Sequence, residues 1–407
     1  MPGLPGTSLF LVLSALGGAG AVDAFAIEAE VRSDTQTIAV GQSHTCAITA
    51  NGGAFCWGRG SWGQLGNRAN TVSIGSPVAV AVPAGEQFVA VSSFSEHSCA
   101  LTGAGDVYCW GEGRSGKLGH GQDRDQNAPV KVSAPEGTKF VSVAAGVFHT
   151  CGVTTTGGAY CWGGGANGQL GNGDTAQAAT PVPVKVPAGV KLVSISAGDR
   201  HTCAVARSGA AYCWGSGSDG RLGNGATASQ TTPVMVTAPA GVKFVAIGAG
   251  TYFTCGLAAT GEAYCWGKNE FGELGTGTAG GDASTPQRVA APEGTQFVAI
   301  DVGGNHACGI TAAGAAYCWG RNGDGQLGDG STSHKAAPVS VGFVSHVQFK
   351  AISAGMYHTC ATAANGTAYC WGRGTDGQLG DSNKRSRQNA LPVSAFGMKF
   401  AVPPHRE

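Results

Sequence analysis

The chain has 407 residues, and its 25 basic and 25 acidic side chains give a formal net charge of zero. A neutral protein lacks the long-range field that steers nucleic-acid-binding proteins to their targets, so we expect no nucleic-acid partner. Glycine contributes 69 residues and charged side chains only 12%, a composition typical of many short strands joined by tight turns.

The N-terminal segment differs from the rest of the chain. Leu9 to Val22 form an apolar run that is too short to span a bilayer but suits the core of a secretory signal peptide. Met1 to Ser8 contain no Lys or Arg, so a disordered tail or a wrongly assigned start is the alternative. We expect a signal peptide at residues 1–26, a linker at 27–35 and no membrane-spanning segment. The expected location is secreted or extracytoplasmic, with a cytoplasmic location as the alternative.

The cysteines reveal an internal repeat. All 14 fall into seven pairs, the two members of each pair are ten residues apart, and successive pairs begin 52 or 53 residues apart. A unit of about 52 residues therefore repeats seven times. It fills residues 36–403 and leaves a short tail at 404–407. The pairs are Cys46 and Cys56, Cys99 and Cys109, Cys151 and Cys161, Cys203 and Cys213, Cys255 and Cys265, Cys308 and Cys318, and Cys360 and Cys370.

The unit from Lys191 to Val236 shows the expected elements. Alternating or β-branched runs predict strands at 191–195, 201–205 and 210–214, and Pro233 begins a fourth strand suited to a sheet edge. Seven such four-stranded antiparallel sheets bury both faces when they stack around an axis, which predicts a single all-β, seven-bladed propeller. The first-strand pattern occurs eight times, from 37–40 to 399–402. Both chain ends should therefore meet in one blade, leaving one copy redundant.

Each predicted hairpin can carry a disulfide. A glycine lies six residues after the first cysteine of every unit, where a three-residue hairpin loop needs a left-handed residue. That loop pairs Thr49 with Gly53 and sets Cys46 opposite Cys56 at a non-hydrogen-bonded position, within disulfide range. We expect seven disulfides if the protein is exported, one between the two cysteines of each pair, and cysteines that merely pack the core are the alternative. Since a hairpin pair supplies two ligands rather than four, no metal site is expected.

A motif around the second cysteine identifies a family. Tyr212, Trp214, Gly215 and the run from Gly220 to Gly223, together with His201 and Gly209, resemble the repeat of the regulator of chromosome condensation family. The other six units repeat this pattern closely, and Phe253 is the one break in the histidine column. The resemblance implies a seven-bladed propeller with the Trp and Tyr columns in the core between blades, and we expect the histidines to bond neighbouring backbone. The paired cysteines resemble exported members rather than nuclear ones.

Function is expected at positions that vary between units. The two residues before the histidine column differ in every unit, and in the family the equivalent ring lies on one propeller face near the axis. Tyrosine and arginine are typical interface anchors, and unpatterned surface variation is the alternative. The predicted partner-binding residues are Trp62, Glu96, Phe148, Arg200, Tyr252, Asn305 and Tyr357, with Phe271 as a further candidate.

These observations predict a non-catalytic propeller that binds a protein partner of unknown identity. The sequence has no nucleophile elbow, phosphate loop or zinc-protease motif, so we expect no enzyme activity, no catalytic residue and no cofactor. The alternative is guanine-nucleotide exchange on a small GTPase, as in the nuclear namesake of the family. That member carries a wedge-like insertion and a basic tail, whereas the units here differ by a single residue in length.

Overall fold

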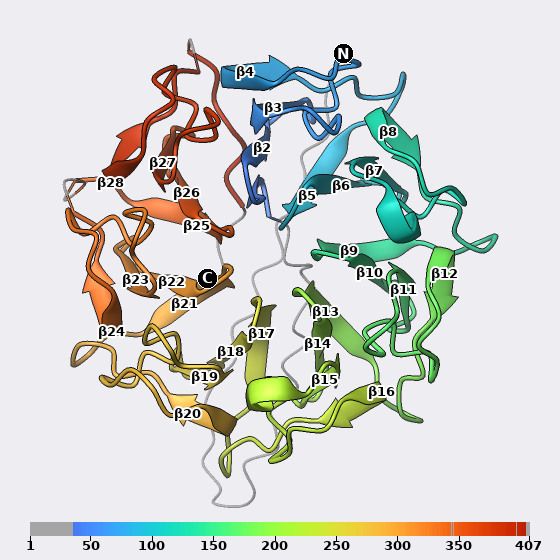
Figure 1. Ribbon diagram of the computed structural model, residues 1–407, viewed down its shortest axis with the longest axis vertical. Helices are drawn as coiled ribbons and strands as arrows, with labels where there is room; N and C mark the ends of the chain where they lie inside the picture. The colour runs from blue at the N-terminus through green and yellow to red at the C-terminus, as the bar shows by residue number, and fades with distance from the viewer. Residues whose placement is uncertain (1–35, 343, 345, 396, 404–407) are drawn as a thin grey trace, which may run out of the picture. The chain divides into compact units, whose positions relative to one another are not determined.

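The computed structural model describes residues 36–342, 344, 346–395 and 397–403, so the predicted signal peptide, linker and tail lie outside the described residues. The described residues form seven four-stranded antiparallel sheets, arranged as the blades of a ring (Figure 1). The predicted all-β, seven-bladed propeller is therefore confirmed. Within the described ranges, no helix is long and apolar enough to cross a membrane.

The strands of each blade follow one another in sequence, from the strand nearest the ring centre to the strand at the rim (Figure 1). Blades 1 to 3 contain β1 (Ile38–Val40), β2 (His44–Ile48), β3 (Ala54–Arg59) and β4 (Ser73–Ala79); β5 (Phe88–Ser93), β6 (His97–Thr102), β7 (Val107–Gly111) and β8 (Gln126–Lys131); β9 (Phe140–Ala145), β10 (His149–Thr154), β11 (Ala159–Gly163) and β12 (Ala178–Pro183). Blades 4 and 5 contain β13 (Leu192–Ala197), β14 (His201–Ala206), β15 (Ala211–Gly215) and β16 (Gln230–Met235); β17 (Phe244–Ala249), β18 (Phe253–Ala258), β19 (Ala263–Gly267) and β20 (Ala283–Arg288). Blades 6 and 7 contain β21 (Phe297–Val302), β22 (His306–Thr311), β23 (Ala316–Gly320) and β24 (Lys335–Ser340); β25 (Phe349–Ala354), β26 (His358–Ala363), β27 (Ala368–Gly372) and β28 (Arg387–Pro392). Two single-turn 3₁₀ helices, η1 (Arg114–Gly116) and η2 (Ser218–Gly220), lie in the loops after β7 and β15.

The rim strand begins earlier than its sequence pattern suggests. In blade 4 we predicted a start at Pro233, but β16 begins at Gln230 because Gly215 pairs with Gln230 beyond a register shift. Because of this bulge, polar residues pair with the neighbouring strand although they do not alternate with apolar residues. The alternation pattern therefore did not predict that they belong to the strand. Pro233 lies on the edge strand of the sheet, as predicted.

The hairpins form with the predicted register. Thr49 N–H donates to the Gly53 carbonyl at 2.8 Å, and Cys46 lies opposite Cys56. The turn glycine has a positive φ in every hairpin, +84° at Gly209, which other residues adopt only with strain. The local turn chemistry therefore sets the pairing of the two central strands in each blade.

Every hairpin carries the predicted disulfide. The two sulfurs of each pair are bonded, the Cα–Cα distances are 4.0–4.1 Å, and no cysteine of the chain is free. The predicted pairing is thus confirmed throughout, and the alternative of cysteines that merely pack the core is wrong. The bonds join Cys46 to Cys56, Cys99 to Cys109, Cys151 to Cys161, Cys203 to Cys213, Cys255 to Cys265, Cys308 to Cys318, and Cys360 to Cys370.

The hydrophobic core lies between blades, as predicted for the tryptophan column. All seven column tryptophans are fully buried, and Trp266 of blade 5 packs with Leu222 and Val236 of blade 4. The indole N–H of Trp266 donates to the Arg221 carbonyl in the preceding blade at 3.0 Å. Each blade thus completes the core of its neighbour, so one blade alone cannot bury its apolar face.

The histidine column bonds to side chains, not to backbone, which corrects our expectation. His149 Nε2 lies 2.7 Å from the Thr202 hydroxyl of the next blade, and Thr202 donates to the Gln169 carbonyl at 2.9 Å. Because the hydroxyl proton is already used, the imidazole must donate its Nε2–H. Similar contacts join a histidine to the next blade at six of the seven junctions. At the seventh, Phe253 replaces the histidine and Ala307 replaces the hydroxyl residue.

Both chain ends meet in blade 1, as predicted, but neither copy of the first-strand pattern is redundant. β1 pairs with the inner part of β2, whereas Phe400 forms a bridge with Thr49 and Ala401 N–H donates to the Ile48 carbonyl at 2.7 Å. The two termini therefore share one strand position. Phe400 supplies the aromatic side chain that the N-terminal copy lacks, and it is buried against Trp57.

Candidate functional site: one face of the propeller

The predicted ring residues all lie immediately before the second strand of a blade, at one end of the sheets. Backbone hydrogen bonds between successive blades fix this end near the axis, as Asp199 N–H donates to the Gly250 carbonyl at 3.2 Å. A Cβ on Gly198 would lie 2.3 Å from the same carbonyl oxygen, so only glycine allows this approach. We call this surface the ring face; it comprises the residues preceding each second strand and the Leu-Gly loops beside them.

The structure places the predicted residues on the ring face with different degrees of exposure. Phe148 and Tyr252 are 40% and 38% exposed, unusual values for large aromatic side chains, and Arg200 is also exposed. Asn305, Tyr357 and Trp62 are half-buried, as is Phe271, which packs edge-on against His334. Glu96 is buried, which differs from our expectation of an accessible anchor.

A cation lies against each of these aromatic rings except Phe271. The guanidinium of Arg200 lies 5.5 Å from the ring centre of Phe148. The remaining pairs are Arg114 with Trp62, Arg221 and Lys268 with Tyr252, and Arg321 and Arg373 with Tyr357, at 5.0–5.4 Å. Each cation–π contact holds a long, flexible side chain over a ring. The ring face therefore presents aromatic side chains whose positions are restrained by neighbouring cations.

The variable residue of the Gly-x-Leu-Gly motif is part of this surface, although we did not predict it from the sequence. Its side chain is buried and reaches the next blade. Lys117 Nζ donates to the Val147 carbonyl at 3.1 Å, and Arg221 Nη1 donates to the Thr251 carbonyl at 3.0 Å. This residue is Gln, Lys, Arg or Glu in different blades, whereas the rest of the motif is uniform. That variation is the sequence feature that could have identified the position.

The junction between blades 1 and 2 contains the buried carboxylate of Glu96. Gln64 of blade 1 donates from Nε2 to Glu96 of blade 2 at 2.5 Å. Burial raises the pKa of Glu96, while the positive charge of Arg59 and the hydrogen bond from Gln64 oppose that rise. Glu96 therefore links two blades and is not an exposed anchor.

Several ionisable side chains of the described residues have pKa values shifted by burial. Burial lowers the pKa of His149 and His306 to about 3, so both are neutral at physiological pH and are occupied by hydroxyl contacts. Burial raises the pKa of Glu273 to about 7 and that of Asp301 to about 6. Asp301 caps the Ala354 N–H at 2.9 Å, which is a structural contact. No cluster of three potential metal ligands occurs among the described residues.

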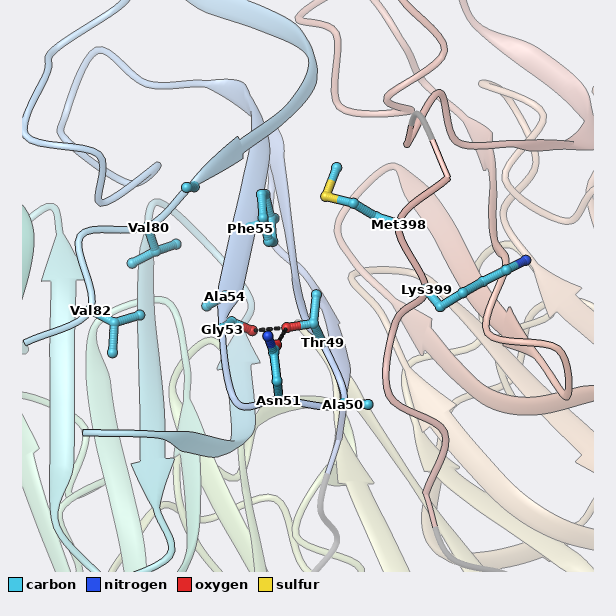
Figure 2. A pocket seen from close by; sticks show the side chains of 11 residues that line it. Thr49, Ala50, Asn51, Gly53, Ala54, Phe55, Val80, Val82, Met398 and Lys399 are labelled. Carbon is cyan, nitrogen blue, oxygen red and sulfur yellow. Dashed lines mark hydrogen bonds between the residues drawn. The ribbon is translucent and has the colours of Figure 1, made fainter. Parts of the chain in front are cut away.

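A pocket of about 510 Å³ lies at the other end of blade 1, beside the hairpin turn. Figure 2 shows the Met398 side chain of the C-terminal segment pointing towards Phe55, whereas the Lys399 side chain points away from the hairpin residues Thr49 and Asn51. The strands of the blade separate this pocket from the ring face, because β2 begins beside the ring residues and ends at the turn. It therefore belongs to the seam where the ring closes.

The fold and the repeated motif define a β-propeller built from regulator of chromosome condensation repeats. Residues 133–400 match the RCC1-like domain, and residues 51–101, 104–153, 36–64 and 88–117 match RCC1 repeat families. The chain belongs to this family.

Two relatives show the range of proteins that contain this domain. The chain is 33% identical over 371 residues to the ultraviolet-B receptor UVR8 of Arabidopsis thaliana, covering 91% of this chain and 84% of the receptor. It is 32% identical over 330 residues to the human E3 ubiquitin-protein ligase HERC2, covering 79% of this chain but only 7% of the ligase.

The fold also matches solved structures. Yeast RCC1 (Prp20), in its complex with Kap60, superposes with a TM-score of 0.76 at 23% identity, covering 86% of this chain and 85% of that one. Human WBSCR16 superposes with a TM-score of 0.73 at 23% identity, covering 81% and 88%.

Proposed function

We propose that this protein is a non-catalytic scaffold that recognises a protein partner through the ring face. The observation that carries the proposal is the set of aromatic side chains held against cations on one face, above all Phe148 with Arg200 and Tyr252 with Arg221 and Lys268. Aromatic residues and arginine dominate the binding energy of protein interfaces. Anchors that are already ordered lose less conformational entropy on binding.

The histidine, cysteine and tryptophan positions that are nearly the same in every blade have a structural role. The histidines, cysteines and tryptophans all make contacts within or between blades, and each type does the same in nearly every blade. The ring face, in contrast to these uniform positions, differs from blade to blade. A surface without sevenfold symmetry can recognise a partner that itself lacks symmetry.

The disulfides support the further proposal that the protein is exported. Fourteen cysteines joined in seven bonds favour an oxidising compartment, since cytosolic reductants keep such thiols reduced. Peptide mapping of the native protein without reduction should recover the linked peptides of each hairpin. Fourteen alkylatable thiols in protein from its native compartment would contradict export.

Nucleotide exchange on a small GTPase is not favoured. The blades repeat at 52 or 53 residues, so no loop is long enough to carry a wedge-like insertion. Accelerated nucleotide release from a purified GTPase in the presence of this protein would revive that alternative.

Alanine substitution on the ring face tests the proposal directly. Replacing the exposed Arg200 or Tyr252 with Ala should leave unfolding free energy within about 0.5 kcal/mol of the parent protein. If these residues are anchors, affinity for the partner should fall by roughly 2 kcal/mol or more. Met235→Ala is the matched control, since Met235 is 61% exposed on the rim strand of blade 4. Unchanged affinity in Ala variants of Phe148, Arg200, Tyr252, Asn305 and Tyr357 would exclude the ring face.

A further inference from the structure

The end of the sheets opposite the ring face carries three exposed cations at blade 4. We call this surface the turn face; it comprises the turns between the second and third strands and the residue before each first strand. These segments meet at one end of the sheets, as Phe244 N–H donates to the Gly209 carbonyl of a turn at 2.8 Å. Lys191, Arg207 and Lys243 are exposed on the turn face, and we call them the basic patch.

The three side chains of the basic patch belong to one turn and the two segments that flank it. Arg207 begins the turn of blade 4, and its backbone N–H donates to the Lys191 carbonyl at 2.8 Å. Lys243 lies on the other side of the turn, since a Cβ on Gly209 would come within 2.7 Å of the Lys243 Cβ. The two lysines precede β13 and β17, which are neighbouring inner strands in contact with each other. The three positive charges therefore share one surface.

The basic patch has no acidic neighbour. Among the described residues, no carboxylate lies within ion-pair distance of any of its three side chains. Asp199 and Asp219 are the only acidic residues between Asp174 and Glu262, and both belong to the ring face. Glu262, after the next turn, is paired with Arg288 at 2.5 Å. The turn face thus has a local excess of positive charge on a protein whose net charge is zero.

Blade 2 indicates which ligand suits this part of the turn face. Lys139, the residue before β9, donates to the carboxylate of Asp106 at 2.9 Å, and Lys131 donates to the other oxygen at 3.0 Å. Asp106 is the residue after the turn glycine of its hairpin. Partial burial raises the pKa of Asp106, but the hydrogen bonds from the two lysines outweigh that effect and lower it. A carboxylate at this position is therefore the natural partner of the lysine before the first strand.

The chain supplies no such carboxylate to the basic patch. The position of Asp106 is taken by Gly158 in blade 3 and by Ala210 in blade 4, and neither side chain can accept a hydrogen bond from a lysine. Lys399, the equivalent lysine beside blade 7, instead donates to the Thr367 hydroxyl at 3.1 Å. The lysines of the basic patch are thus left available for a carboxylate from another molecule.

We propose that the basic patch binds an acidic segment of a partner protein, whose carboxylates contact Lys191, Arg207 and Lys243 as Asp106 contacts Lys139. The inference goes beyond the proposed function, because it assigns a second binding surface at the opposite end of the sheets. Complementary charges at an exposed surface mainly increase the association rate and the specificity of binding. Binding should therefore weaken as the ionic strength rises.

Fluorescence anisotropy with labelled hexaglutamate at low ionic strength tests the basic patch, and labelled hexaglutamine is the uncharged comparison. The parent protein should bind hexaglutamate more tightly than hexaglutamine. The triple variant Lys191→Gln, Arg207→Gln, Lys243→Gln should weaken hexaglutamate binding by about tenfold, since each exposed ion pair contributes about a factor of two. No preference for hexaglutamate in the parent protein would overturn the proposal.

A second triple variant separates the basic patch from the net charge of the protein. Lys185→Gln, Arg385→Gln, Lys399→Gln removes the same charge from exposed positions outside the patch. This variant should bind hexaglutamate nearly as well as the parent protein does. Equal weakening by the two triple variants would overturn the proposal.

A carboxylate introduced into the chain provides a sharper test. Ala210→Asp and Gly158→Asp place a carboxylate where blade 2 has its own, so each should occupy a lysine of the patch and weaken hexaglutamate binding. The backbone of Gly158 is outside the left-handed region, and a Cβ there meets no atom closer than 3.5 Å, so aspartate fits. Ala315→Asp adds the same charge at the equivalent exposed position of blade 6, where a glutamine replaces the lysine, and should have little effect. Equal weakening by Ala210→Asp and Ala315→Asp would contradict the inference.

Two further measurements identify the surface and the class of ligand. Tyr252→Ala should leave hexaglutamate binding unchanged, whereas a loss would place the peptide on the ring face and overturn the inference. Tighter binding of phosphatidylserine vesicles or of polyphosphate than of hexaglutamate would also overturn it, because the patch would then recognise phosphate groups. Since these measurements use a peptide and not the partner of the ring face, the inference and the proposed function can fail separately.

Discussion

The contribution of the histidine–hydroxyl contacts to stability can be tested by introducing, at another junction, the residues of the one junction that lacks this contact. At the junction of blades 5 and 6, Phe253 replaces the histidine and Ala307 replaces the hydroxyl residue. The change to make is His149→Phe together with Thr202→Ala. Thr202→Ala alone leaves the buried His149 N–H without a partner, at a cost of about 1–3 kcal/mol. His149→Phe alone should cost less, about 0.5–1.5 kcal/mol, because Thr202 keeps its bond to the Gln169 carbonyl.

The double variant should lose less stability than the sum of the single changes, with a coupling of about 1 kcal/mol or more. Urea unfolding of the oxidised protein at neutral pH measures all four members of the cycle. Strictly additive losses would refute the view that the two side chains act as a pair.

The single variant His149→Phe should also make the stability of the protein less sensitive to acid. The pKa of His149 is lowered by burial from 6.5 to about 3, so the folded state binds fewer protons than the unfolded state between these values. The stabilisation from neutral His149 is therefore complete above pH 6.5 and declines as the pH falls towards 3. At pH 5 the decline is about 2 kcal/mol, at about 1.4 kcal/mol per pH unit. His149→Phe should therefore lose about 2 kcal/mol less than the parent between pH 7.5 and pH 5. Identical pH profiles for parent and His149→Phe would refute the reasoning.

Three further changes test the fold. Replacing Cys203 and Cys213 together with Ala should lower the unfolding free energy by about 3 kcal/mol, measured by urea unfolding, since the bond closes a short loop of the unfolded chain; a variant as stable as the parent would count against this. Phe400→Ala should cost about 3–5 kcal/mol because Phe400 completes the core at the ring closure, and a loss as small as that of exposed Met235→Ala would show that the C-terminus does not close the ring. Gly209→Ala should cost about 1 kcal/mol because its φ is +84°, and calorimetry showing no lower melting point would contradict the turn assignment.

The fold could be predicted from the sequence because its signals are local. The ten-residue spacing of Cys203 and Cys213, with Gly209 between them, fixes the hairpin register, and the register sets the disulfide. The number of copies sets the number of blades. The shared strand in blade 1 could not be predicted, because it depends on where the two ends overlap in space.

The details of the ring face depend on packing between blades, which the sequence does not display. Glu96 occupies a variable position like Tyr252, yet it is buried because Gln64 of the preceding blade reaches it. The histidine partners lie 53 or 54 residues away at five of the six contacts, too far for any local pattern to indicate. An alignment of the seven repeats would have shown that Phe253 replaces the histidine and Ala307 replaces the hydroxyl residue at the same junction.

The most direct test of the central claim is site-specific photo-crosslinking in the cells that produce the protein. A photoreactive phenylalanine analogue would replace Tyr252 on the ring face or, in a second variant, Met235 on the rim of the neighbouring blade; both side chains are exposed. We predict a discrete covalent adduct with one partner protein at position 252 and none at position 235. Adducts at position 235, with none at position 252, would contradict the assignment of the ring face as the binding surface.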